Sequence, residues 1–146
     1  MDNILKEQIK EYCKYLQDWN LSYEEYAKSV GLSYTNLLIL DVVFKTENCT
    51  QKIISESLFL PKQTVNGAIT YFYKKGFLKL EELPENRRMK TIHFTDAGKK
   101  YAESILLKVR NAEYKAMEKL TKEEREALLK MTKSFTEHCI NILRRY

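Results

Sequence analysis

The chain has 146 residues, 44% of them hydrophobic and 31% charged, which is the balance of a soluble globular protein with room for one buried core. Its 25 basic and 20 acidic residues give a formal net charge of +5, and its three scattered cysteines do not suit a disulfide framework. No signal peptide is recognisable, and the longest apolar run (37–44) is far shorter than the roughly 20 residues of a membrane span, so we expect a cytoplasmic protein without a membrane partner.

The first third of the chain is predicted to form three helices. Apolar and aromatic residues at steps of four and three predict a helix over 4–19: Leu5, Ile9, Tyr12, Leu16 and Trp19. Ser22 and Glu25 have the spacing of a capping box, which predicts a second, short helix from about Tyr23 to Gly31. Ser33 then begins a helix through Phe44 that is apolar almost all round, so we expect it to be the buried centre of the domain.

Two further helices are predicted to follow a short connection. Thr50 is a suitable N-cap for a helix from Gln51 to about Leu58, and the next helix runs from Pro61 to about Lys75 and stops at Gly76. The second of these helices has two distinct faces. Its apolar side carries Val65, Ile69 and Phe72, and its polar side carries Gln63, Asn66, Gly67 and Thr70.

After Gly76 the apolar period changes to two, which predicts a β-hairpin. Leu78 and Leu80 alternate with polar residues in the first strand, and Ile92 and Phe94 alternate with Thr91 and His93 in the second. The intervening segment, 83–90, predicts a cationic tip with Arg87, Arg88 and Lys90.

Two long helices are predicted to complete the chain. Thr95 caps the first, whose apolar positions are Tyr101, Ile105, Val109, Ala112 and Ala116. Thr121 and Glu124 form a capping box for the second. An apolar seam of Leu128, Thr132, Phe135, Cys139 and Ile142 follows it in steps of four and three.

The charge is concentrated where the helix pair meets the hairpin. Residues 61–100 contain nine basic and four acidic residues, whereas residues 1–60 contain six basic and nine acidic ones. Two helices joined by a short turn and followed by a basic hairpin are typical of a winged helix-turn-helix, whose second helix enters the major groove of DNA. We therefore expect Gln63, Thr64, Asn66 and Thr70 to read bases and Lys62 to lie near a phosphate.

Two features of this predicted interface have an alternative interpretation. The polar face and the cationic tip with Arg87, Arg88 and Lys90 could be solvated surface, although together they favour DNA, with the arginines suited to a minor groove. Gly67 costs about 1 kcal/mol in mid-helix relative to alanine. This cost predicts a close approach there, either by a base or sugar edge or by tight helix packing.

Three segments resemble, in order and in spacing, the MarR family of bacterial transcription regulators, and the resemblance covers nearly the whole chain. GLSYTNLLILDVVF (31–44) is similar to the family's helix before the helix-turn-helix, and LPKQTVNGAITYFYKKGFL (60–78) resembles its recognition helix. Asn86-Arg87-Arg88, followed by Phe94-Thr95 and Gly98, resembles its wing motif Asp-x-Arg…Leu-Thr-x-x-Gly, with Asn86 in place of the Asp.

The resemblance implies a mainly α fold with a small two-stranded β wing, in one domain over residues 1–146. Within it, residues 32–98 would form the winged helix-turn-helix core, and 1–31 and 99–146 would supply the N- and C-terminal dimerisation helices. The implied protein is a homodimer, binding double-stranded DNA at a palindromic operator as a repressor. Arg88 would enter the minor groove, steadied in the family by the motif's Asp; Asn86 lacks that charge but can still accept a hydrogen bond.

The resemblance also implies a small aromatic or phenolic effector bound between the dimerisation and DNA-binding parts. Trp19, Tyr23, Tyr34 and Phe44 are candidates to line such a pocket, although tyrosines on these helices are more often core or interface. Some family members sense peroxides through a cysteine on the first helix. Cys13 is the candidate for such a sensor here, with a small buried hydrophobe as the alternative.

The remaining function classes find little support in the sequence. The two histidines, His93 and His138, belong to no cluster with metal-ligand spacing, and no phosphate-binding loop or catalytic pair is recognisable. We therefore expect no enzyme, no metal and no cofactor. The alternative from another class is a winged-helix module that binds protein and not DNA.

Overall fold

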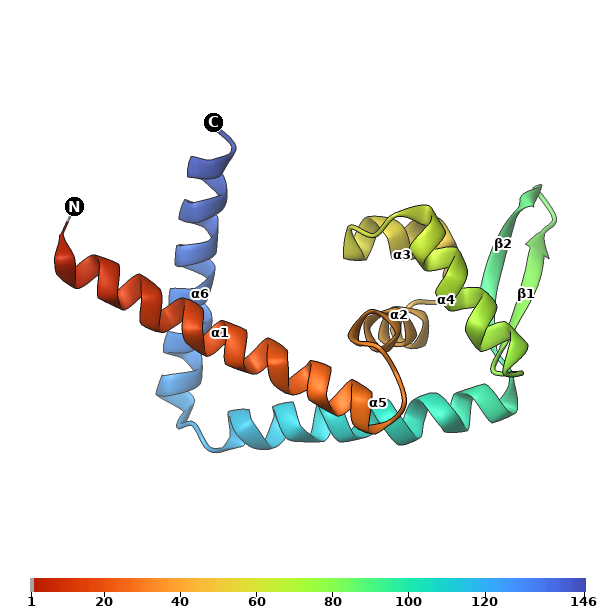
Figure 1. Cartoon of the computed structure of the whole chain (residues 1–146), viewed down its shortest axis with the longest axis horizontal. Helices are drawn as coiled ribbons and strands as arrows, with labels where there is room; N and C mark the ends of the chain where they lie inside the picture. The colour runs from red at the N-terminus through yellow and green to blue at the C-terminus, as the bar shows by residue number, and fades with distance from the viewer. Residues whose placement is uncertain (1) are drawn as a thin grey trace. The chain divides into compact units, whose positions relative to one another are not determined.

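The computed structural model describes residues 2–146, and within them it contains six helices and one antiparallel sheet of two strands (Figure 1). In chain order the elements are α1 (Asn3–Ser29), α2 (Tyr34–Lys45), α3 (Gln51–Leu58), α4 (Lys62–Lys74), β1 (Leu78–Leu83), β2 (Asn86–Phe94), α5 (Asp96–Glu118) and α6 (Lys122–Leu143). Contacts divide the chain into two compact units, one ending at Ile105 and one running from Leu106 to Tyr146. The mainly α fold with a small β-hairpin is therefore confirmed.

A single helix, α1, occupies the region for which two helices are predicted from the sequence. The Ser22 hydroxyl donates to the carbonyl oxygen of Trp19 at 2.6 Å, inside the helix, instead of capping a new one. No Gly or Pro interrupts Asn3–Ser29, and a mid-helix serine can bond back to the preceding turn, so nothing forces a break. The capping-box prediction at Ser22 is wrong, whereas the end near Gly31, which has a positive φ of 78°, is confirmed.

The second helix, α2, is the centre of the core, as predicted. Ser33 caps it by accepting the backbone N–H of Asn36 at 3.1 Å. The helix contacts α1, α3, α4 and β2. It buries five apolar side chains against them: Leu37, Ile39, Leu40, Val42 and Val43.

The helix-turn-helix has nearly the predicted bounds. Thr50 accepts the backbone N–H of Ile53 at 3.2 Å, and α3 ends at Leu58. Phe59 turns the chain in the left-handed conformation (φ 52°) with its side chain 93% exposed, an arrangement that costs a bulky residue about 1–2 kcal/mol. Pro61 is the N-cap of α4 and not its first residue, because its ψ of 145° is extended.

The wing is a hairpin that is anchored to the helix-turn-helix at its base. Leu78 pairs with Phe94 and Glu82 with Lys90, and the register then shifts so that residues 87–89 fall between the paired positions Asn86 and Lys90. The backbone N–H of Ile92 also donates to the carbonyl oxygen of Cys49 at 2.7 Å, which attaches the segment before α3 to β2. The cationic tip is thus carried by a bulged end, while the base is fixed to the core.

The residues of the wing motif form a tight joint between α4, β1 and α5. The Thr95 hydroxyl donates to the carbonyl oxygen of Gly76 at 2.6 Å and accepts the backbone N–H of Gly98 at 3.0 Å, so Thr95 caps α5 as predicted. A Cβ atom on Gly98 would lie 1.8 Å from the Phe77 carbonyl oxygen, and the Phe77 and Tyr101 rings stack at 4.1 Å. Gly98 therefore permits a backbone contact that no other residue allows.

The last helix, α6, begins at the predicted capping box and carries an exposed apolar face. The Thr121 hydroxyl accepts the backbone N–H of Glu124 at 3.1 Å, and the Glu124 carboxylate accepts that of Thr121 at 2.8 Å. No residue of α6 is buried within the single chain. Its helical period places the predicted seam and two neighbours on one arc: Leu128, Met131, Thr132, Phe135, Cys139, Ile142 and Leu143.

The first helix also exposes apolar side chains, namely Ile4, Leu5, Ile9, Leu16, Trp19 and Leu21. Among the described residues no single helix is long and apolar enough to cross a bilayer. Only α1 and α2 taken together would meet that requirement, and they are bent by 88° at their break.

Candidate nucleic-acid interface

The fourth helix divides into a buried face and an outward face, as its sequence predicts. Val65, Ala68, Ile69 and Phe72 are buried in the core. The opposite side therefore faces outward: Lys62, Gln63, Thr64, Asn66 and Gly67 are exposed, and Thr70 is half-buried. All six are candidate DNA-binding residues, and the core packing of α4 presents them on its outer side.

Gly67 lies on this outer face with open space around it. A Cβ atom built there would meet nothing within 4 Å, apart from the backbone of its own helix and its neighbours. Tight packing within the described chain therefore does not explain a mid-helix glycine. A close approach by a base or sugar edge at this position stays a prediction.

We expect Gly67→Ala to raise the free energy of unfolding by about 0.5–1 kcal/mol, because alanine is the better helix former and its methyl group meets no atom. Urea denaturation measures this gain. The same variant should bind DNA more weakly if a base or sugar edge approaches the helix there. A destabilised variant would contradict the open surroundings, and an unchanged affinity would contradict the close approach.

Asn66 is in contact with the start of α3. The side-chain amide of Gln51 donates to Oδ1 of Asn66 at 3.4 Å, across 15 positions of sequence. The residues predicted from the sequence to read bases do not include Gln51, because no local pattern signals a bond that the helix-turn-helix creates.

The cationic tip of the wing is exposed, and Asn86 shapes it. Arg87, Arg88 and Lys90 are all exposed. Oδ1 of Asn86 accepts the backbone N–H of Arg88 at 3.2 Å, which is a bond to the main chain and not to the guanidinium. An amide oxygen accepts such a bond as a carboxylate oxygen would. Asn86 can thus support the turn without the charge of the motif's Asp.

A groove between the wing and α3 gathers three cationic side chains. It has a volume of about 400 Å³ and is lined by Thr50, Gln51, Lys52, Asn86, Arg88, Met89 and Lys90. Lys52 is 3.9 Å from Glu56, and both side chains are about two-thirds exposed, so this ion pair is weak. The groove brings Lys52, which the sequence does not rank among the main DNA contacts, beside the predicted Arg88 and Lys90.

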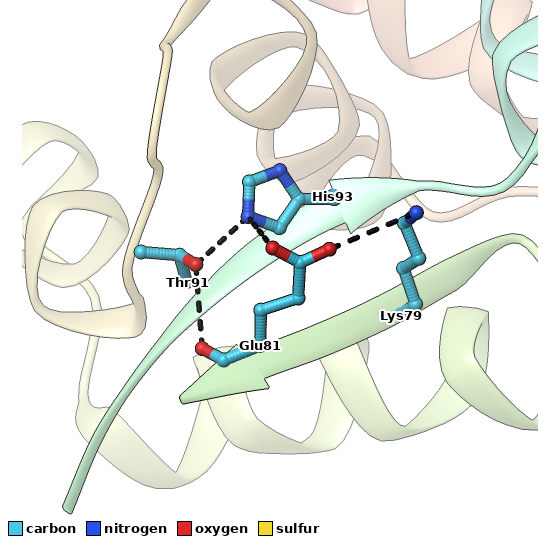
Figure 2. A network of polar contacts seen from close by, with 4 residues as sticks. All are labelled: Lys79, Glu81, Thr91 and His93. Carbon is cyan, nitrogen blue, oxygen red and sulfur yellow. Dashed lines mark hydrogen bonds and ion pairs between the residues drawn. The ribbon is translucent and has the colours of Figure 1, made fainter. Parts of the chain in front are cut away.

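The base of the wing is held by the polar network shown in Figure 2. The Thr91 hydroxyl donates to the Glu81 carbonyl oxygen at 3.3 Å and lies 2.8 Å from Nε2 of His93. Because the hydroxyl has one hydrogen, Nε2 is the donor in the second contact. The Glu81 carboxylate lies 3.5 Å from Nε2 and 3.7 Å from the Lys79 ammonium. This network joins β1 to β2 below the cationic tip.

The four aromatic residues proposed for an effector pocket lie in two places. Trp19, Tyr23 and Tyr34 form a row, with ring centroids 5.8 Å apart for the first pair and 6.4 Å for the second. Phe44 contacts Phe94 at 6.0 Å, at the other end of α2, about 15 Å along the helix axis from Tyr34. The row from α1 and α2 is the better candidate for the wall of an effector pocket, because its three rings lie next to one another.

The three cysteines differ in their surroundings. Cys13 and Cys139 are exposed, and Cys49 is fully buried. Burial raises the pKa of the Cys49 thiol to about 11. Among the described residues, no group of three or more His, Cys, Asp and Glu side chains is arranged to hold a metal ion.

We expect Cys49 to resist alkylation in the native protein at pH 8, because it is inaccessible and almost wholly protonated there. Mass mapping after treatment with iodoacetamide, with and without urea, measures this protection. In urea, the extent of modification of Cys13 and Cys139 provides the internal comparison for Cys49. Modification of Cys49 in the folded protein at the rate seen in urea would contradict the buried position.

Comparison with known proteins finds the same architecture in solved structures. No protein-family model matches the chain, and no curated protein matches it. A MarR family transcription regulator superimposes with a TM-score of 0.83 at 15% identity, over 99% of this chain and 95% of that one. The MarR family regulator NMB1585 from Neisseria meningitidis gives 0.75 at 20% identity, over 94% and 97%.

A third similar structure is Staphylococcus aureus MarR in complex with salicylate and kanamycin, with a TM-score of 0.75 at 16% identity, over 94% of this chain and 93% of that one. At such identities the likeness establishes the fold. The chain has the winged helix-turn-helix fold of MarR family regulators over nearly its whole length.

Proposed function

We propose that this chain, which has the MarR family fold, is a member of that family and regulates transcription by binding specific DNA sequences as a homodimer. The observation that carries the proposal is the outward face of α4 beside the cationic wing. The six residues of that face contribute little to the core, and the wing and groove beside it are rich in Lys and Arg. Polar, amide-bearing side chains flanked by cations have the chemistry that base edges and phosphates require.

Each part of this surface has its own proposed role. Gln63, Thr64, Asn66 and Thr70 read base edges in the major groove, where Gln and Asn bond adenine and Thr contacts a thymine methyl. Gly67 lets the duplex approach α4 closely. Lys62 and Lys90 bind phosphates, and Arg87 and Arg88 enter the adjacent minor groove.

The proposed dimer is supported by the apolar side chains that α1 and α6 leave exposed. On this proposal residues 1–31 and 99–146 pair with a second copy, and residues 32–98 bind DNA, within a single domain. Two recognition helices then bind half-sites about one helical turn, roughly 34–36 Å, apart on a palindromic operator.

The regulator is proposed to act as a repressor that a small molecule releases. One structural neighbour is a complex with salicylate, and the Trp19–Tyr23–Tyr34 row offers aromatic surface for a ligand of that class. An effector that binds better to a dimer with mis-spaced recognition helices would shift the population away from the DNA-binding state.

Selection of binding sites from random duplex DNA, at near-physiological salt, tests the proposal. An enriched palindrome is the expected result. Binding without enrichment would contradict sequence-specific regulation. No binding at all would favour the alternative of a protein-interaction module.

We expect Asn66→Ala and Arg88→Ala to weaken binding to the selected site in different ways. Losing the Asn66 amide should cost about 1–3 kcal/mol on the cognate site and relax preference at one base position. Losing Arg88 should weaken binding more evenly across sequences and lower the salt slope by about one. Titrations at several salt concentrations, on cognate and scrambled duplexes, measure both effects.

Lys14→Ala is the matched control for the charge, because it removes one cation from an exposed position on α1. Its affinity and salt slope should stay close to those of the unaltered protein. If Asn66→Ala and Arg88→Ala also bind like the unaltered protein, the groove assignment is wrong.

A further inference from the structure

Gln51 lies where the two parts of the proposed DNA interface meet. It is the first residue of α3, it lines the cationic groove, and its side-chain amide donates to Asn66 on α4. This hydrogen bond joins a residue of the groove to a proposed base-reading residue of α4. The N···O distance of 3.4 Å is long for such a bond, so the pair is loosely held in the protein without DNA.

The backbone that carries Gln51 is firmly placed. Cys49 is fully buried, and its carbonyl oxygen accepts the N–H of Ile92 from β2 at 2.7 Å. Thr50 is nearly buried and caps α3 through its hydroxyl. The start of α3 is therefore fixed to the strand that carries Arg88 and Lys90, which leaves the Gln51 side chain as the adjustable part.

The groove beside Gln51 suits a DNA phosphate. Lys52 contributes a cation from α3, and Arg88 and Lys90 contribute two from the wing. Cations from two separate elements can contact one segment of phosphate backbone and fix the protein's position along the duplex. Gln51 also lines this groove, and its amide has a second N–H that can bond a phosphate oxygen.

The same amide also limits how Asn66 can turn. An asparagine reads adenine by accepting from one base atom and donating to another, which requires a fixed orientation of its amide. A bond to Gln51 occupies one lone pair of Oδ1 and favours one orientation. Asn66 is exposed, and water alone would not favour one orientation of its amide.

We propose that Gln51 is a positioning residue that couples phosphate binding in the groove to base reading by Asn66. A phosphate seated between Lys52 and Lys90 holds the Gln51 amide, and Gln51 in turn holds Asn66 in the orientation that discriminates its base. This proposal rests on the proposed function. It adds that discrimination at the Asn66 position depends on a residue that touches no base.

The test compares Gln51→Met with Lys52→Met in the full-length protein. Methionine is close in length to both side chains and removes the amide or the charge. The base read by Asn66 is the position at which Asn66→Ala loses its preference. The measured quantity is the ratio of affinities for the selected site and for the site with that base changed, because uniform electrostatic effects cancel in it.

We expect Gln51→Met to lower this ratio by about threefold to tenfold, the range of one neutral hydrogen bond. Lys52→Met should weaken binding to both duplexes, with a smaller salt slope. It should also lower the ratio, but by less than Gln51→Met does, because the phosphate that holds Gln51 loses one of its cations while the Gln51 amide remains. In the Asn66→Ala background, Gln51→Met should leave the ratio unchanged, because the residue it positions is absent.

The outcomes separate this inference from the proposed function. If the unaltered protein enriches no site, both fail. If it enriches a site and Gln51→Met keeps the full ratio, only the positioning role fails. A loss of ratio that persists in the Asn66→Ala background would also overturn it, because Gln51 would then read the base by itself. Urea denaturation of each variant checks that an altered ratio does not come from loss of folding.

Discussion

Gly98→Ala should destabilise the protein by roughly 3 kcal/mol or more, one of the two largest effects expected from a single substitution in this chain. The new Cβ atom would lie 1.8 Å from the Phe77 carbonyl oxygen and 2.6 Å from its carbonyl carbon. Backbone atoms cannot rotate aside as a side chain can, so the start of α5 must move away from the backbone of Phe77. That movement would also strain the Thr95 hydrogen bonds to Gly76 and Phe77.

Urea denaturation at one protein concentration measures the effect, and Gly67→Ala is its matched control. Both glycines lie in helices and both changes add one methyl group, but only Gly98 faces another backbone. The two variants should therefore change stability in opposite directions. Equal and small effects would mean that the joint at Gly98 is looser than the structure describes.

Phe135→Glu should abolish the proposed homodimer and, with it, high-affinity operator binding. Phe135 lies in the middle of the α6 apolar arc and is 46% exposed in the single chain. Ile142, on the same arc, is 53% exposed. An unpaired carboxylate in an apolar interface is costly to bury, so association should weaken by several kcal/mol. Sedimentation equilibrium measures the dimer, and a titration with the selected duplex measures the binding.

Lys130→Glu is the control for this substitution, because Lys130 lies on the opposite side of α6 from the apolar arc. It introduces the same carboxylate and should leave the oligomeric state unchanged. A Phe135→Glu protein that remains dimeric would place the interface elsewhere. A monomeric one that still binds the full operator tightly would contradict binding as a pair.

Elements with strong local signals could be predicted from the sequence to within a residue or two. Thr50 and Ser33 cap their helices as predicted, and the capping box at Thr121 is present. These signals succeed because a cap involves atoms only two or three residues apart. The two faces of α4 were predictable for the same reason, since helical periodicity alone separates buried Val65 and Ile69 from exposed Gln63 and Asn66.

What could not be predicted depends on contacts between distant residues or on competing local bonds. Ser22 has the spacing of a cap, but its hydroxyl bonds within a helix that nothing interrupts. The need for glycine at position 98 arises from Phe77, 21 residues earlier. Nothing in the sequence distinguishes Phe44 from the other aromatic candidates. In the structure it lies more than two helical turns from Tyr34 along α2.

The structure places the predicted residues of α4 and the wing at the surface and adds the contacts between them. Asn66, Arg88 and Lys90 are exposed on α4 and the wing as expected. The pairing of Gln51 with Asn66 and the groove that includes Lys52 require the folded helix-turn-helix. The roles of these residues in DNA recognition remain predictions.

The division of α4 into two faces has a consequence for how such a protein can diversify. The outward residues Gln63, Thr64 and Asn66 lie apart from the side chains that hold the helix in place. Substitutions at these positions should therefore change the stability of the fold little. If these residues read DNA as proposed, a lineage could exchange them one at a time and acquire new target sequences without passing through unstable variants. On the proposed positioning role, Gln51 restricts this freedom, because a new side chain at position 66 would require a matching partner on α3.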